Sequence, residues 1–143
     1  MKYVVDTCII NKLVDGLLEP EVLPSNGEFV ASHVQIDELN KTKDRERRDR
    51  LFLKFATTVK EVVPTETAVI GISRIGHCKI SNGNLYIKLK TELDSVNGGK
   101  ANNSMDALIA EIAVKNNYTL LTADHDLHQV ASNNGCNVVY WQT

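Results

Sequence analysis

Short apolar runs alternate with longer amphipathic segments along the whole chain. Runs rich in β-branched and aromatic residues predict four strands, in the stretches KYVVD (2–6), EFVAS (28–32), YTLL (118–121) and CNVVYW (136–141). A shorter run, EVV at 61–63, ends at Pro64 and predicts a brief fifth strand. The nearly continuous apolarity of KYVVD is typical of a parallel strand that is buried on both faces.

The segments between these runs have helical spacing. Helices are predicted over 7–18, 32–41, 41–60, 65–78, 85–96, 104–117 and 122–135, with Thr7 and Ser32 as N-caps of the first two. The clearest is SMDALIAEIAVKNN, in which Met105, Leu108 and Ile112 lie on one face. Two glycines and several β-branched residues weaken the pattern over 65–78.

This alternation predicts an α/β fold in three layers, with a short, mainly parallel central sheet and helices on both of its faces. The chain has 143 residues, which suits a single domain over 1–143 with one substantial core.

Composition and charge exclude several classes of function. The net charge of about −2 excludes a strongly basic protein that coats nucleic acid, although it leaves room for a local basic patch. Three scattered cysteines, Cys8, Cys78 and Cys136, argue against a disulfide scaffold and a clustered zinc site. His125 and His128 have zinc-ligand spacing but lack nearby partners. No signal peptide or membrane span is evident, so we expect a cytoplasmic protein.

Acidic residues recur where a parallel α/β sheet places its active site. Asp6 and Asp124 each follow a predicted strand, Glu38 lies in the helix after the second strand, and Asp106 lies in the first turn of the clearest helix. Carboxylates that meet in one place repel one another unless a cation lies among them. Mg²⁺ prefers oxygen ligands, makes water more acidic and neutralises charge on a phosphate. Such a cluster therefore favours phosphodiester hydrolysis.

Each acid also has a simpler interpretation. Asp6 and Asp124 suit an N-cap, Glu38 suits an exposed helix surface, and Asp106 suits the positive end of a helix dipole. Asp37 competes with Glu38 for the same role, and Asp126 is readily explained as a helix-start residue. The joint pattern favours the functional interpretation more than any single residue does.

Three blocks in this order, VVDTCIIN, QIDELNK and MDALIAEIAVKNNYTLLTADHDL, resemble the PIN-domain nucleases, especially the bacterial VapC-type toxins. The resemblance covers most of the chain. It implies a PIN-like α/β/α fold and an Mg²⁺- or Mn²⁺-dependent endoribonuclease that hydrolyses RNA. It also implies a toxin–antitoxin setting with an antitoxin partner, and often a homodimer. The stretch from Pro64 to Asn102 is longer than in compact toxins, and its role is not assigned.

The resemblance also implies residue roles. The metal-binding and catalytic quartet is Asp6, Glu38, Asp106 and Asp124, with Asp126 as a further metal ligand. Thr7 and Thr122 are expected to support the site by binding a carboxylate or metal-coordinated water.

A basic run follows Glu38 and is interleaved with acids. The simple interpretation is a solvated helix with ion pairs along its surface. Alternatively, some of its cations flank the acidic site and contact RNA phosphates, namely Lys41, Lys43, Arg45, Arg47, Arg48 and Arg50.

Two other functions are compatible with parts of this sequence. A haloacid-dehalogenase-type phosphatase also begins with a strand and an Asp, but it needs a second Asp at the position of Cys8. A non-catalytic PIN-fold RNA-binding or regulatory domain would usually have lost some acids, whereas this chain has all four.

Overall fold

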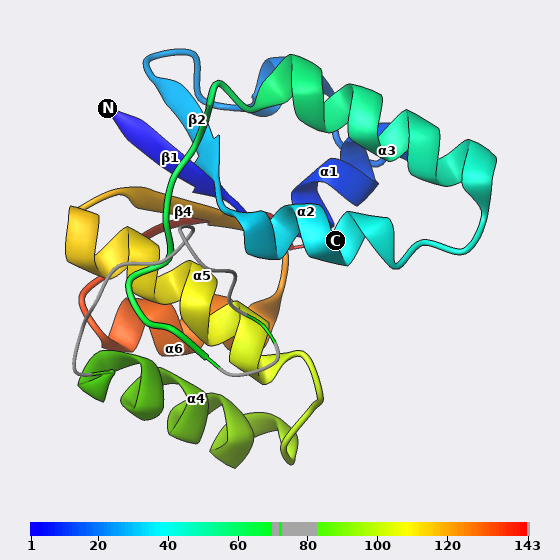
Figure 1. The fold of residues 1–143 in the computed structure, drawn as a ribbon. Helices are drawn as coiled ribbons and strands as arrows, with labels where there is room; N and C mark the ends of the chain where they lie inside the picture. Colours follow the sequence, from blue (N-terminus) through cyan, green and yellow to red (C-terminus); the bar gives the residue numbers. More distant parts are fainter. Residues whose placement is uncertain (70–71, 73–82, 143) are drawn as a thin grey trace.

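The structure, a computed structural model, describes residues 1–69, 72 and 83–142. Its centre is one five-stranded sheet with the strand order β3-β2-β1-β4-β5 (Figure 1). The strands are β1 (Lys2–Val5), β2 (Glu28–Ala31), β3 (Glu61–Val62), β4 (Thr119–Thr122) and β5 (Asn137–Tyr140). Each neighbouring pair is parallel, so the predicted α/β class and parallel sheet are confirmed.

Alternate residues of the inner strands enter two different cores. On β1, Val4 packs into one core, while Tyr3 and Val5 pack into the other. Leu120 and Leu121 of β4 divide in the same way. Successive strand side chains point to opposite faces, so strands that are buried on both faces need apolar residues at nearly every position.

Helices cover both faces of the sheet. Helices α1 (Thr7–Val14) and α3 (Arg45–Thr58) lie on one side, and α4 (Asn84–Asn97), α5 (Asn103–Asn116) and α6 (His125–Asn133) lie on the other (Figure 1). Helix α2 (His33–Asn40) contributes Val34 to one core and Leu39 to the other. A short 3₁₀ turn spans Pro20–Val22.

Helix α5 is buried more completely than its apolar stripe predicts. Every residue from Asp106 to Ala113 is buried, because α5 packs against α4, α6 and β1. Its small residues Ala107, Ala110 and Ala113 let these neighbours approach closely. Two carboxylates, those of Asp106 and Glu111, are consequently buried on this one helix.

The predicted caps have mixed outcomes. Ser32 is the N-cap of α2, and its side chain forms a capping box with Gln35, as its position predicts. The assignment of Thr7 as a cap was wrong by one residue. Asp6 is the N-cap of α1 and makes no side-chain cap hydrogen bond, because its carboxylate is engaged elsewhere. The N-cap of α5 is Asn102.

The helix predicted over 65–78 is absent where the structure describes this stretch. Residues 65–69 are not helical, and their β-branched side chains Thr65, Thr67 and Val69 are weak helix formers after a proline. The remaining residues of that prediction, apart from Ile72, lie outside the described residues, together with Cys78. Among the described helices, none is long and apolar enough to cross a bilayer.

Candidate acidic site

The four predicted acids lie around the carboxyl end of the central strand β1. This strand lies between β2 and β4, so the connections leave it in opposite directions and create a topological switch point. Asp6 follows β1 directly, and its backbone N–H donates to the Leu121 carbonyl of β4 over 3.0 Å. Asp6 and the end of β4 are thereby joined at the same edge of the sheet.

Hydrogen bonds hold the Asp6 carboxylate in one orientation. Thr122 Oγ1 donates to Asp6 Oδ2 over 2.8 Å, and Cys8 Sγ lies 3.1 Å from the same oxygen. Thr7 Oγ1 lies 3.4 Å from the other oxygen, Oδ1. The carboxylate is only 4% exposed, so these donors replace the water that it loses on folding.

Thr7 also connects Asp6 to Glu38. The Thr7 hydroxyl donates to Glu38 Oε2 over 2.9 Å, although α1 and α2 are separate helices. Glu38, rather than its neighbour Asp37, makes this bond to the cluster. Within the described part of the chain, Glu38 Oε1 is a buried oxygen without a hydrogen-bond partner.

Asp106 and Asp124 complete the cluster from two further elements. Asp106 is 5% exposed in the first turn of α5, and Asn102 Nδ2 lies 3.3 Å from its Oδ2. Asp124 caps α6, since its Oδ1 accepts the Asp126 and Leu127 N–H groups. The cap uses one oxygen of this carboxylate, so capping and membership of the cluster are compatible.

Burial and mutual repulsion disfavour the ionised forms of these acids. Burial raises the pKa of Asp106 to about 9, and the charges of Asp6, Glu38 and Asp124 add to this effect. Burial and the nearby Asp6 raise the pKa of Glu38 to about 7. Burial also raises the pKa of Asp6 itself, although bonds from Thr122 and Cys8 oppose the increase. The four side chains therefore form one electrostatic cluster.

Two lysines lie near this cluster. Among the described residues, neither forms an ion pair with it. Lys41 lowers the pKa of Glu38 through space, and Lys100 does the same for Asp106. The ion pairs that do form lie elsewhere, such as Arg47 with Asp15 and Lys90 with Asp94. The described side chains therefore give these carboxylates no ion-pair partner, and their protonated forms are favoured until a cation binds.

The donor set suits a hard divalent cation. Among the described residues, no group of three or more His, Cys, Asp or Glu side chains is arranged so that it could hold a metal ion. Mg²⁺ does not require one, because it keeps several waters and takes only one or two carboxylates directly. The orphaned Glu38 Oε1 and the crowded carboxylates fit such an ion, which would remove both electrostatic penalties.

The remaining predicted residues are more dispersed. Asp126 Oδ1 lies 3.5 Å from His125 Nδ1 in the first turn of α6. The ring of His128 stacks on Tyr140 at a centroid distance of 4.4 Å. Arg47 bonds Asp15 and Asn11 of the α1 region, and Arg48 donates to the Thr42 carbonyl. Lys43 and Arg45 are exposed beside them.

Sequence reasoning missed three residues of the site. Cys8 packs against the core, and its sulfur also contacts Asp6 and accepts the Ala123 N–H over 3.3 Å. Lys100 and Asn102 belong to a glycine-rich loop that precedes α5. Lys100 lies six residues before Asp106 and Asn102 lies four residues before it, and this proximity was the available signal.

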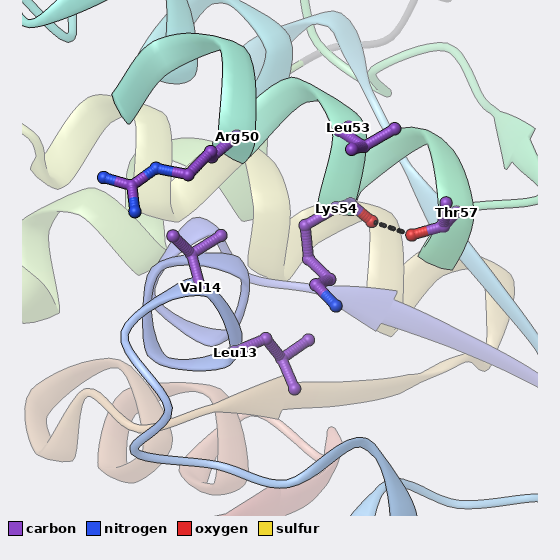
Figure 2. A pocket seen from close by; sticks show the side chains of 6 residues that line it. All are labelled: Leu13, Val14, Arg50, Leu53, Lys54 and Thr57. Atoms are coloured by element: carbon purple, nitrogen blue, oxygen red, sulfur yellow. Dashed lines mark hydrogen bonds between the residues drawn. The ribbon is translucent and has the colours of Figure 1, made fainter. Parts of the chain in front are cut away.

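A separate groove lies between α1 and α3 (Figure 2). Leu13 and Val14 of α1 and Leu53 of α3 form its apolar lining, and its volume is about 370 Å³. Figure 2 shows Arg50 on one side and Lys54 extending from α3 towards Leu13. Leu53 is 67% exposed, which is unusual for a large apolar side chain.

Comparisons with known proteins show which solved structures share this fold. No family model and no curated protein matches the chain. Similar solved structures include VapBC2 from Rickettsia felis bound to a promoter DNA fragment, with a TM-score of 0.63, 21% identity and coverage of 99% of this chain and 100% of that one. VapBC-1 from nontypeable Haemophilus influenzae has a TM-score of 0.58, 18% identity and full coverage of both chains.

A PilT N-terminus domain protein from Sulfolobus solfataricus P2 is also similar. Its TM-score is 0.50 at 16% identity, and the match covers 98% of this chain and 87% of that one. The chain therefore has the fold of VapC-type and PilT N-terminus (PIN) domain proteins, as the sequence resemblance predicted.

Proposed function

We propose that the chain is an Mg²⁺- or Mn²⁺-dependent endoribonuclease and the toxin of a toxin–antitoxin pair. One observation carries the proposal: Asp6, Glu38, Asp106 and Asp124, from four separate segments, converge on one largely buried group of carboxylates with which no described cation forms an ion pair. A purely structural role does not explain this cluster, because unpaired buried charge destabilises a fold.

The residues around the cluster have distinct tasks in this mechanism. Thr122, Cys8 and Thr7 hold the Asp6 carboxylate, and Thr7 also holds Glu38, so the acids are oriented before any ligand arrives. Lys41 and Lys100 lie near the acids and attract the phosphodiester that an acidic surface alone would repel. A divalent cation held among these acids would acidify water and neutralise charge on the phosphate. Asp126 remains a further proposed ligand.

RNA cleavage tests the proposal directly. Purified protein is incubated with a mixed-sequence RNA in Mg²⁺, in Mn²⁺ or in EDTA, and fragments are resolved by gel electrophoresis. We expect cleavage with either cation and none in EDTA. Asp6→Asn keeps the shape of the side chain but removes its charge, so it should abolish cleavage. Undiminished cleavage in EDTA or in this variant would overturn the mechanism.

A non-catalytic RNA-binding domain is the alternative that the same experiment separates. Such a protein would retard RNA in a gel without cutting it under any cation. Contaminating nuclease is controlled by purifying Asp6→Asn in parallel through the same steps. Activity that persists in both preparations would come from the contaminant.

We propose a cellular setting from the solved structures that this chain resembles. The Rickettsia felis and Haemophilus influenzae structures are VapBC complexes, so we propose an antitoxin partner for this chain as well. A homodimer is part of the same proposal. Sedimentation analysis of the purified chain tests it, and a single species of 15.9 kDa would argue against it.

A further inference from the structure

Three rings gather at the end of the strand β5. The imidazole of His128 stacks on the phenol ring of Tyr140, with a centroid distance of 4.4 Å and an interplanar angle of 14°. The imidazole of His125 lies 6.3 Å from the same phenol ring, at an interplanar angle of 70°. In the sequence the two histidines have zinc-ligand spacing, whereas in the structure both of them contact an aromatic side chain.

Strand register places these rings beside the acidic site. Tyr140 is the parallel partner of Thr122, so the two side chains lie on the same face of the sheet, on strands about 4.8 Å apart. Thr122 is the residue whose hydroxyl donates to Asp6. His125 directly follows Asp124 along the chain. The rings therefore border the carboxylates on the β5 side.

Solvent reaches this group of rings. The His125 side chain is 70% exposed, and His128 and Tyr140 are half-buried at the last strand of the described sheet. His125 Nδ1 lies 3.5 Å from Asp126 Oδ1, and this contact leaves the faces of the imidazole free. Packing of α6 on β5 accounts for the stacked pair. It does not account for His125, because most of that side chain is open to water.

We propose that His125, His128 and Tyr140 form a stacking site for an unpaired base of the RNA, next to the phosphodiester that is cleaved. The inference rests on the proposed nuclease function and adds a binding site to it. The base stacks on the exposed ring of His125. Tyr140, which His128 holds by stacking, is the fixed ring against which His125 lies.

The chemistry of a base suits this position. A base has a π-face and no formal charge, so it can lie beside carboxylates that would repel a phosphate. The phosphates remain with Lys41 and Lys100, as in the proposed mechanism. Paired bases are stacked within a helix and their faces are covered, so only an unpaired base can bind. Every base has a π-face, and we therefore expect little preference among the four bases at this site.

RNA binding without cleavage tests the stacking site. Protein that contains Asp6→Asn is titrated in EDTA at low ionic strength into a short fluorescein-labelled oligouridylate, and anisotropy gives the Kd. Trp141 is the single tryptophan, and its N–H donates to the Thr122 carbonyl over 3.1 Å, so its fluorescence reports on this end of β5. We expect saturable binding that quenches Trp141. Binding that leaves Trp141 fluorescence unchanged would place the strand elsewhere and overturn the site.

Ring variants in the same Asp6→Asn background assign the contacts. His125→Ala removes the exposed ring and should raise the Kd roughly 5- to 100-fold, the range for loss of one base–aromatic stack. Tyr140→Leu should also raise the Kd, whereas Tyr140→Phe keeps the ring and should not. Tyr118→Leu is the matched control, because Tyr118 is equally half-buried but lies before β4, at the opposite edge of the sheet. Circular dichroism and thermal melting verify that each variant is folded.

A duplex of the oligouridylate with oligoadenylate provides a second measurement. Its backbone carries more charge than the single strand, but its bases are covered, so it should bind at least tenfold more weakly. Equal or tighter binding of the duplex would mean that the protein reads the backbone alone, and it would overturn the stacking site.

The outcomes separate this inference from the proposed function. An unchanged Kd in His125→Ala and Tyr140→Leu overturns the stacking site, even if Tyr140→Leu has a lower Tm, because packing alone would then explain the rings. Metal-dependent cleavage by the wild type alongside that result leaves the nuclease proposal standing. Weaker binding confined to the ring variants supports the site even if the wild type never cuts RNA.

Discussion

Helix α5 contains two buried carboxylates, Asp106 in its first turn and Glu111 just over one turn later, and they have opposite surroundings. Asp106 lies among three other carboxylates at the sheet edge. Glu111 is 0% exposed and its Oε1 has no hydrogen-bond partner among the described residues, but Thr67 Oγ1 donates to its Oε2 over 2.9 Å and Lys115 provides a nearby positive charge. Burial raises the pKa of both groups, and only Asp106 has neighbouring charges as the next largest cause.

This contrast shows which signal points to a site. Burial of a single carboxylate is compatible with a structural role, since a hydroxyl partner and a nearby cation reduce its cost. Convergence of several like charges from separate segments has no such structural use. Because both groups lie on α5, the effects of substituting Asp106 and Glu111 can be compared directly.

The largest difference should appear in catalysis. Asp106→Asn should reduce RNA cleavage by at least about 100-fold, because the cluster loses one of its four charges. Glu111→Gln makes an equivalent change five residues along and should leave cleavage within about threefold. Initial rates on one RNA with saturating Mn²⁺ measure both. Similar losses in the two variants would mean that α5 matters for folding and not for a site.

A smaller difference should separate the two threonines that bond these carboxylates. Thr122→Val removes the donor to Asp6 and should lower cleavage or cation affinity about 10- to 100-fold, as expected for a residue that orients a ligand. Thr67→Val removes the donor to Glu111 and should change stability alone. Cation titrations of the cleavage rate provide the measurement. A loss of activity in Thr67→Val that matches the loss in Thr122→Val would contradict this assignment.

Cation binding should stabilise the fold through Asp106 and not through Glu111. At about 100 times its Kd, a ligand of the native state adds about 2.7 kcal/mol, which corresponds to a rise in Tm of roughly 5–10 °C. We expect this rise with Mn²⁺ in the wild type and in Glu111→Gln, and little of it in Asp106→Asn. Scanning calorimetry with and without EDTA measures it. A full rise in Asp106→Asn would place the cation elsewhere.

A further expected effect is on the pH dependence of stability. The pKa of Asp106 rises from 3.8 to about 9 and that of Glu38 from 4.5 to about 7, so the folded state binds more protons than the unfolded state between these limits. The free energy of unfolding therefore falls as pH rises from about 4 to about 9 in EDTA. Tm should drop across this range, and saturating Mn²⁺ should flatten the slope. A Tm that rises with pH in EDTA would contradict the raised pKa values.

The fold was largely predictable because local pattern and tertiary position agree for most elements. The apolar run before Asp6 became β1, and the stripe after Ser104 became α5, close to their predicted bounds. The helix expected at 65–69 failed because β-branched residues follow Pro64 there. The cap at Thr7 failed because both Asp6 and Thr7 are capping types, and tertiary bonds decided between them.

The acidic site was predictable in its members and less so in its contacts. Strand-end positions of Asp6 and Asp124 indicate a shared edge, since parallel strands end together. The choice between Asp37 and Glu38 required the bond to Thr7, because adjacent helix residues point in directions that differ by only about 100°. The Cys8 contact with Asp6 had no sequence signal beyond proximity along the chain.

The sequence by itself determined the order and type of the elements, because periodicity and β-branching act over a few residues. It also determined that acids follow strands and helix starts. The tertiary structure alone decided which side chains meet, since that depends on how distant segments pack and on which hydroxyls reach which carboxylates. The hydrogen bond from Thr7 to Glu38 is the clearest case, because it exists only where α1 approaches α2.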